Sequence, residues 1–278
     1  MKKIFIACVA CLVVFTSMIA VKTKESPVEN TSKIVSNNNY TDNSLRIEYW
    51  VDSLYAAMHL SDKGLSRSVF FAACKGYEFM LAQNSLVKDG ILTICDFSQS
   101  SSKKRLYVLD LEQCKILFNT YVSHGRNSGS DYANSFSNSN ESHKTCLGFM
   151  RTAETYIGDN GYSMRLDGME NGFNDNARTR AIVMHGSDYV SRQRVAKGIV
   201  MGRSYGCPAV PAAEVKSIIN SIKGGSCFFN YYPDKLYTQT SKILNSSFSW
   251  PVIQDLQLAS AKIPDSLAKF LSAPNPVN

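Results

Sequence analysis

The chain has 278 residues, of which 44% are hydrophobic and 19% are charged, and its formal net charge is +7. This composition excludes a chain that is disordered along its whole length, and the length allows one sizeable catalytic domain with flanking segments. Lysine and arginine form no long run, which argues against nucleic acid as a partner.

Residues 1–20 have the pattern of a secretory signal. Lys2 and Lys3 precede an apolar run over residues 4–15, and small or polar residues follow. The run is shorter than the ~20 apolar residues that a membrane-spanning helix needs. We therefore expect a signal peptide over 1–20 and export to the periplasm or cell envelope, with no membrane contact beyond the signal. Its removal lowers the net charge from +7 to +5, which still favours an anionic polymer such as the cell wall.

Six of the eight cysteines follow residue 20. An even number in an exported protein is compatible with disulfides, but the spacings here are wide and irregular. Cys74 and Cys95 lie inside apolar stretches, where buried free thiols are expected. The chain after residue 20 has no Cys-x-x-Cys pair, and its histidines are scattered, which argues against a zinc site. We expect no metal and no cofactor.

The first part of the chain is predicted to be a linker followed by helices. Residues 21–44 are polar and rich in Asn, Ser and Thr, as in a linker. Residues 45–90 form an N-terminal helical segment with helices predicted over 45–60 and 66–81. The second helix carries one apolar stripe, formed by Phe70, Cys74, Tyr77 and Leu81, which we expect to pack against a sheet.

Strand patterns begin at residue 91. The runs at 91–97, 105–111 and 115–122 predict a small antiparallel meander joined by polar turns. Residues 123–180 are rich in Gly, Asn and Ser with few strand-length runs, and loops of that length are usually functional. We expect parts of this stretch to fold over an active site as a lid. The predicted fold class is therefore mainly β with flanking helices (α+β) and a long lid-like insertion.

The last elements are predicted around one short strand and one helix. Residues 181–184 have a buried-strand pattern that ends at His185, and Pro211 begins a helix that runs to residue 222. Residues 226–232 form a closing strand. The catalytic domain thus spans 91–232, and residues 233–278 form a C-terminal tail.

Cys207 and His185 have the environment that a cysteine nucleophile and its base require. Gly206 lets the backbone bend so that its own N–H and that of Cys207 can face one oxyanion. His185 is followed by Gly186, whose carbonyl can accept a hydrogen bond from the imidazole and leave its second nitrogen ready for the thiol. Each signal is weak alone, since Cys207 could be a structural thiol and His185 a histidine that only ends a strand.

The combination resembles the L,D-transpeptidase (YkuD-type) catalytic domain, in particular the murein L,D-transpeptidase branch. The resemblance covers residues 65–232 and rests on His-Gly after an apolar strand and Ser-x-Gly-Cys before a helix. Further matching segments lie at 96–98, 104–110, 118–125, 135–138, 141–143, 166–168, 172–178 and 181–186. The family has a mostly β domain whose cysteine forms a thioester with a peptidoglycan stem peptide, which an amine or water then resolves.

The resemblance implies that Cys207 is the nucleophile, that His185 accepts its proton and that Gly186 orients the imidazole. It also implies that Gly206 and Cys207 supply the oxyanion N–H groups.

Four residues nearby are candidates for substrate contact. Arg203 and Ser204 precede the cysteine turn, and the guanidinium of Arg203 suits a stem carboxylate, although a solvated surface arginine fits equally well. Tyr205 stands where the broader family has a second histidine, which leaves substrate contact and thiolate tuning open. His124 could line the same cleft or serve only the turn beside Gly125.

These observations predict cysteine-dependent acyl transfer on peptidoglycan stems, by L,D-transpeptidation or by the hydrolytic L,D-carboxypeptidase reaction. A catalytic Cys207 is expected to be alkylated below neutral pH as a paired thiolate. The alternative, motivated by Tyr205, is a cell-wall-binding protein that keeps the fold without catalysis. A cysteine protease that cleaves ordinary L-peptides is a third possibility.

Overall fold

The structure is a computed structural model that describes residues 34–202, 204–248 and 250. The predicted signal peptide over 1–20 lies outside the described residues. No helix within these ranges is long and apolar enough to cross a membrane.

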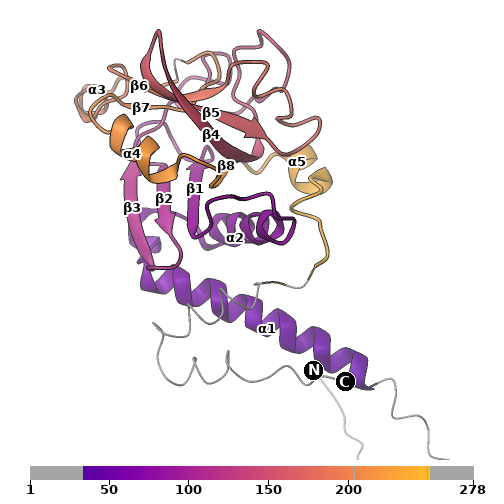
Figure 1. Cartoon of the computed structure of the whole chain (residues 1–278). Coiled ribbons are helices and arrows are strands. Elements are labelled where there is room, and N and C mark those ends of the chain that lie inside the picture. The colour runs from indigo at the N-terminus through magenta and orange to yellow at the C-terminus, as the bar shows by residue number, and fades with distance from the viewer. Residues whose placement is uncertain (1–33, 203, 249, 251–278) are drawn as a thin grey trace, which may run out of the picture. The chain divides into compact units, whose positions relative to one another are not determined.

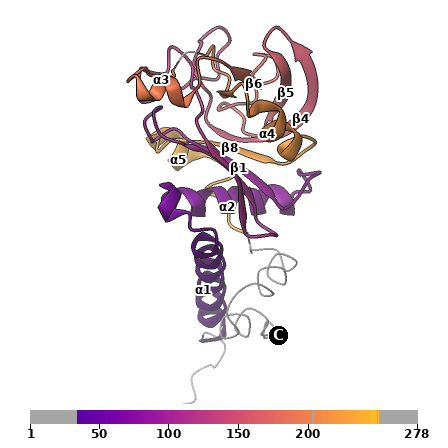
Figure 2. The same ribbon diagram turned by 90° about the vertical axis from the view of Figure 1, so that its left-hand side faces the viewer.

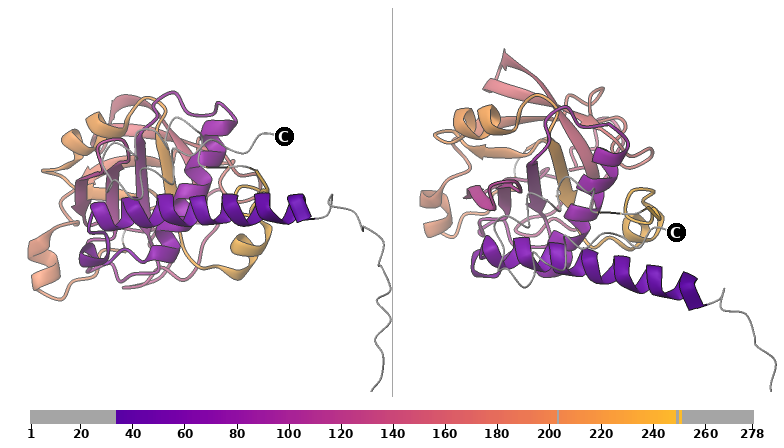
Figure 3. Two further views of the ribbon diagram at one scale, coloured as in Figure 1. Left: turned by 90° about the horizontal axis from the view of Figure 1, so that it is seen from below. Right: turned by 60° about the horizontal axis from the view of Figure 1, so that its bottom comes forward.

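The chain divides into two units, residues 1–39 and residues 40–278. Helix α1 (Ile34–Ala57) begins in the first unit and ends in the second. The helix is continuous (Figure 3), so residues 34–44 of the expected linker are helical. No Pro or Gly stands in that segment to stop the helix, which explains its extension toward the N-terminus.

Eight strands form one sheet in the order β3-β2-β1-β8-β4-β5-β6-β7. Figure 1 labels these strands. The β1–β8 and β6–β7 pairs are parallel and the others antiparallel. The fold is therefore mostly β, as predicted, and the predicted meander is present as β1, β2 and β3. The strands are β1 (Ile91–Asp96), β2 (Leu106–Asp110), β3 (Lys115–Thr120), β4 (Gly148–Gly158), β5 (Gly161–Gly168), β6 (Val183–Ser187), β7 (Ala209–Pro211) and β8 (Cys227–Tyr231).

Helices cover the sheet at two places. Helix α2 (Arg67–Ala82) packs on β1 and β8, whereas α4 (Val215–Ile222) packs on β5 and β6 (Figure 2). Side chains alternate between the two faces along a strand. In β1, Leu92 and Ile94 therefore lie in the core under α2. Ile91 and Cys95 lie in the core under α4. The six residues of β1 are all buried for this reason.

Helix α2 matches its predicted range, and it begins where Ser66 caps it by accepting a hydrogen bond from the N–H of Val69 at 3.3 Å. Cys74 and Cys95 are buried and form no disulfide, as predicted.

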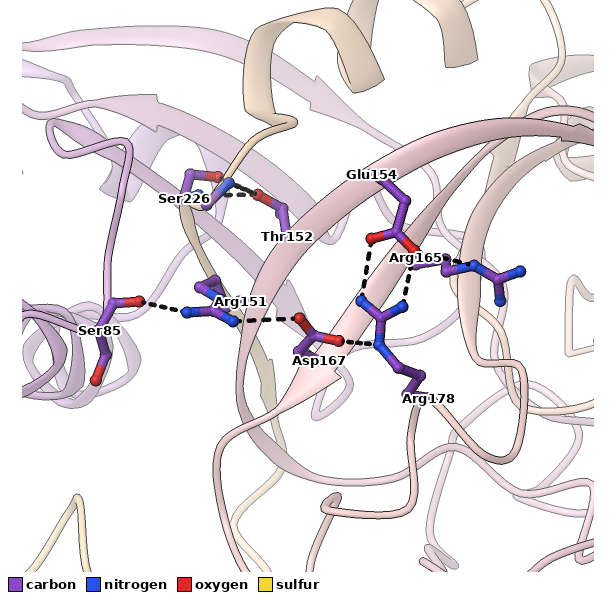
Figure 4. Close-up of polar contacts among 9 residues, drawn as sticks. Ser85, Arg151, Thr152, Glu154, Arg165, Asp167, Arg178 and Ser226 are labelled. Atoms are coloured by element: carbon purple, nitrogen blue, oxygen red, sulfur yellow. Dashed lines mark hydrogen bonds and ion pairs between the residues drawn. The ribbon is translucent and has the colours of Figure 1, made fainter.

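Residues 123–180 are not the single long loop that was expected, because β4 and β5 form a hairpin there. The polar residues that obscured these strands point away from the core and pair with one another (Figure 4). Arg178 lies 2.6 Å from Asp167 and 2.7 Å from Glu154, and Arg151 and Arg165 pair with the same two carboxylates. The lid remains a prediction for the loops on either side of the hairpin.

The helix predicted to begin at Pro211 begins instead at Val215. Residues Ala209–Pro211 are extended because they pair in parallel with β6, which satisfies backbone groups that a helix would otherwise use.

The first part of the predicted C-terminal tail packs on the core. Helix α5 (Lys235–Thr240) buries Tyr237, whose hydroxyl donates to the carboxylate of Glu170 at 2.8 Å. Trp250 is also buried, with its ring centroid 6.2 Å from that of Trp50. The tail beyond residue 250 lies outside the described residues. The remaining short helices are η1 (Ser61–Lys63) and α3 (Arg192–Ala196).

Candidate active site

Strand β6 carries His185 at its centre, beside β7. His185 is in register with Ala209 across the parallel β6–β7 pair and is 5% exposed. Its Nδ1 lies 2.9 Å from the carbonyl of Gly186, the contact expected from the sequence. A carbonyl can only accept, so Nδ1 carries the proton and Nε2 is left as a lone-pair acceptor. The imidazole is thereby oriented as a base.

Cys207 lies in the turn that leads into β7, and its side chain is half-buried. Its Sγ accepts from the N–H of Val183 at 3.4 Å and its S–H donates to the carbonyl of Ala181 at 3.6 Å. The thiol is therefore held against the beginning of β6, two residues before His185. The structure thus brings the thiol of Cys207 against the strand that carries His185.

The pKa shifts of Cys207 and His185 bear on the charge state of this pair. Burial raises the pKa of the Cys207 thiol, an effect opposed by the N–H of Val183 and the charge of Arg180. Burial also lowers the pKa of His185, and the hydrogen bond to the Gly186 carbonyl opposes this effect. Both shifts favour the neutral forms, thiol and imidazole, over thiolate and imidazolium. The expectation of a thiolate below neutral pH stays a prediction, and these shifts act against it.

Arg180 is a site residue that the sequence analysis missed. Its guanidinium donates to the carbonyls of Ser137 at 2.7 Å and Lys144 at 2.6 Å, and to Oγ of Ser142 at 3.1 Å. Its positive charge acts on Cys207 and lowers the pKa of that thiol. A basic residue directly before the buried strand that ends at His185 is the signal that could have found it.

The turn before Cys207 is fixed by backbone contacts. Gly206 has φ of +118°, a conformation that favours glycine, and its N–H donates to Oγ of Ser204 at 3.1 Å. Ser204 in turn pairs with Gly125 and is buried. The Gly206 N–H thus donates to the hydroxyl of Ser204 in this structure, and its expected role as an oxyanion donor stays a prediction. The Cys207 N–H has no hydrogen-bond acceptor in the part of the chain that the structure describes, and it is left as the oxyanion donor.

His124 lies in the interior rather than in a cleft. Its Nδ1 accepts from Arg105 at 2.7 Å, and its Nε2–H donates to the carbonyl of Gly129 at 3.2 Å. Burial and the adjacent Arg105 lower the pKa of His124 to about 4, so the ring is neutral. A side chain added at Gly202 would collide with this ring. His124 therefore supports the loop before the cysteine turn from beneath, and it has no free nitrogen for substrate.

The remaining two candidates differ in position. Tyr205 is 63% exposed beside the cysteine turn, where a substrate could contact it. Arg203 lies outside the described residues.

Together these groups can perform acyl transfer. A thiol nucleophile, an oriented neutral base, a backbone N–H and a nearby guanidinium are the parts that the reaction needs. Within the described ranges, no three His, Cys, Asp or Glu side chains gather in a group that could hold a metal ion.

Comparisons with known proteins give a family match. A family model described as the L,D-transpeptidase catalytic domain matches residues 61–231. A comparison with curated proteins gives no match.

Solved structures give low-scoring matches. An L,D-transpeptidase from Mycobacterium smegmatis is 11% identical, with a TM-score of 0.32 over 51% of this chain and 59% of that chain. The helical cell shape determining protein Pgp2 from Campylobacter jejuni is 14% identical, with a TM-score of 0.32 over 68% and 62%. The chain thus spans about three fifths of the length of each of these proteins.

Proposed function

Since this chain belongs to the L,D-transpeptidase catalytic domain family, we propose that it transfers acyl groups on peptidoglycan stem peptides, with Cys207 as the nucleophile. The observation that carries the proposal is the shared strand: β6 holds the thiol through Val183 and presents His185 two residues later. An oriented base beside a cysteine is the arrangement that covalent acyl transfer requires.

The first half of the reaction forms a thioester. As Sγ of Cys207 attacks the carbonyl carbon of the scissile amide, Nε2 of His185 takes the thiol proton. The N–H of Cys207 and the charge of Arg180 stabilise the negative charge that develops on the carbonyl oxygen. The tetrahedral intermediate collapses with cleavage of the C–N bond, and His185 returns its proton to the leaving amine.

The second half releases the acyl group. An amine of another stem, or water, attacks the thioester while His185 takes its proton. The C–S bond then breaks, and the proton returns to the departing sulfur of Cys207. With an amine the protein is an L,D-transpeptidase, and with water it is an L,D-carboxypeptidase; both reactions use the same residues.

We place this activity outside the cytoplasmic membrane. The basic and then apolar pattern of residues 1–20 supports export to the periplasm or cell envelope. Peptidoglycan stem peptides are the partners at that location.

A second candidate is a non-catalytic protein that binds the cell wall. Tyr205 and the raised pKa of the resting Cys207 thiol favour it. Incubation with purified tetrapeptide stems separates the two functions, because the catalytic protein gives cross-linked or shortened products that mass analysis detects. Binding without any product supports the non-catalytic protein, and products that persist in Cys207→Ala contradict the proposed nucleophile.

A further inference from the structure

A cavity of about 590 Å³ lies beside the cysteine turn. Its lining residues are Arg126, Gly129, Ser130, Val200, Gly202 and Tyr205. Two contacts join this cavity to the turn, since Gly125 pairs with Ser204 and the N–H of Arg126 donates to the carbonyl of Ser204 at 2.7 Å. The cavity wall and the backbone that positions Cys207 therefore form one connected unit.

Arg126 is held in place although its side chain is exposed. Its guanidinium lies over the ring of Tyr205, 4.6 Å from the centroid, and its Nη2 lies 2.9 Å from Nδ1 of His143. The rings of His143 and Tyr205 are themselves 4.5 Å apart with 31° between their planes. An arginine fixed on an aromatic face loses less conformational entropy when it binds a ligand.

The charge of Arg126 is not balanced by any acidic residue that the structure describes. No carboxylate of the described residues lies within ion-pair distance of it, whereas Arg178 pairs with both Glu154 and Asp167. The side-chain hydrogen bond of Arg126 goes to an imidazole, which leaves most of its N–H donors available. A planar guanidinium with free donors is suited to bidentate binding of a carboxylate.

From these contacts we infer that Arg126 and Tyr205 form a carboxylate-binding subsite for an acidic stem peptide. The inference rests on the proposed function and deepens it: the cavity holds the part of the stem that carries the carboxylate while the scissile amide lies at Cys207. Tyr205 then acts as the platform for Arg126, which gives a role to the residue that departs from the family pattern.

The test measures binding without turnover, in the Cys207→Ala protein. The probes are a purified peptidoglycan tetrapeptide stem and the same tetrapeptide with its carboxylates amidated. We expect Arg126→Gln to weaken binding of the acidic probe at least tenfold in calorimetry and to leave binding of the amidated probe nearly unchanged. Arg67→Gln, which makes the same charge change at the beginning of α2, is the matched control and should leave both affinities unchanged.

The platform is tested separately. Tyr205→Phe keeps the aromatic face and should bind the acidic probe as the parent does, whereas Tyr205→Ala should resemble Arg126→Gln. If Arg126→Gln loses equal affinity for both probes, or loses none, the subsite is overturned. Binding of the stem by the parent protein would still support the proposed function. If neither probe binds the Cys207→Ala protein, the subsite and the proposed function both fail.

Discussion

The backbone N–H of Val183 donates a hydrogen bond to Sγ of Cys207 at 3.4 Å. Val183 begins β6, and His185 lies two residues further along the same strand. The positions of nucleophile and base are therefore set by one strand and by its parallel pairing with Ala209. A strand fixes such positions more tightly than a loop does.

The neutral state of the pair predicts the reactivity of the thiol. Because burial raises the pKa of Cys207 above its ordinary value of 9.0, we expect its alkylation by iodoacetamide to keep accelerating through pH 9. His185→Asn should leave this profile nearly unchanged, since the resting imidazole carries no charge. Peptide mapping assigns the label to Cys207. A plateau below pH 7 that His185→Asn abolishes would show a preformed ion pair instead.

Arg180 is predicted to assist the reaction through its charge. Arg180→Gln removes the positive charge that opposes the burial effect on Cys207, so the thiol pKa should rise further and alkylation at a given pH should slow. The charge of Arg180 is also proposed to stabilise the oxyanion. We therefore expect Arg180→Gln to lower kcat about a hundredfold.

The matched control is Arg178→Gln, two residues earlier, whose side chain pairs with Glu154 and Asp167. It should keep both the alkylation profile and kcat. Arg180→Lys restores the charge and should restore the alkylation profile. If Arg180→Gln loses activity with an unchanged alkylation profile, its role is structural only.

Gly206 is predicted to tolerate no side chain. Its φ is +118°, and a Cβ there would lie 2.6 Å from the carbonyl oxygen of Lys144. We expect Gly206→Ala to abolish activity and to lower the free energy of unfolding by about 2–3 kcal/mol, from backbone strain and displacement of the turn. Urea unfolding measures this loss.

Gly172 is the control, because its φ is +82° and nothing lies within 4 Å of an added Cβ. Gly172→Ala should cost only about 1 kcal/mol for the backbone conformation and leave activity intact. Equal effects of the two substitutions would mean that space at the cysteine turn is not limiting.

His124 predicts a pH dependence of stability. Its pKa falls from 6.5 to about 4 on folding, so between these values the unfolded chain binds a proton that the folded protein does not. Stability therefore decreases as pH falls from 6.5 to 4, by about 3 kcal/mol from this residue, and no further below pH 4. The lowered pKa of His185 acts in the same direction.

His124→Gln should flatten this part of the pH profile in urea unfolding experiments, whatever its effect on absolute stability. An unchanged slope in His124→Gln would show that the buried ring is protonated in the folded state.

The predictable parts of the fold are those with uniform local patterns. The apolar stripe through Phe70, Cys74 and Tyr77 predicted helix α2 to within one residue at each end. Runs of β-branched residues predicted the meander. The β4–β5 hairpin was missed because residues such as Glu154 and Asp167 interrupt its apolar pattern, and they are satisfied only by arginines brought there by folding. Tyr237 and Trp250 likewise become core residues only through distant partners, so the tail gave no local signal.

In the site, too, some features follow from local patterns and others only from folding. Cys207 and His185 stand in short motifs whose chemistry can be recognised locally, including the Gly186 carbonyl. The contribution of Arg180 depends on where the loop of Ser137 and Lys144 folds, which no local pattern encodes. The burial of His124 and the charge state of the thiol are also products of packing around the site.

The central claim is that Cys207 becomes acylated by a peptidoglycan stem. Intact-protein mass spectrometry after acid quenching of a reaction with a purified tetrapeptide stem tests it directly. We predict a covalent mass increase in the parent protein and in Cys114→Ala, and none in Cys207→Ala. An adduct that persists in Cys207→Ala, or products formed at the parent rate by that variant, would contradict the claim.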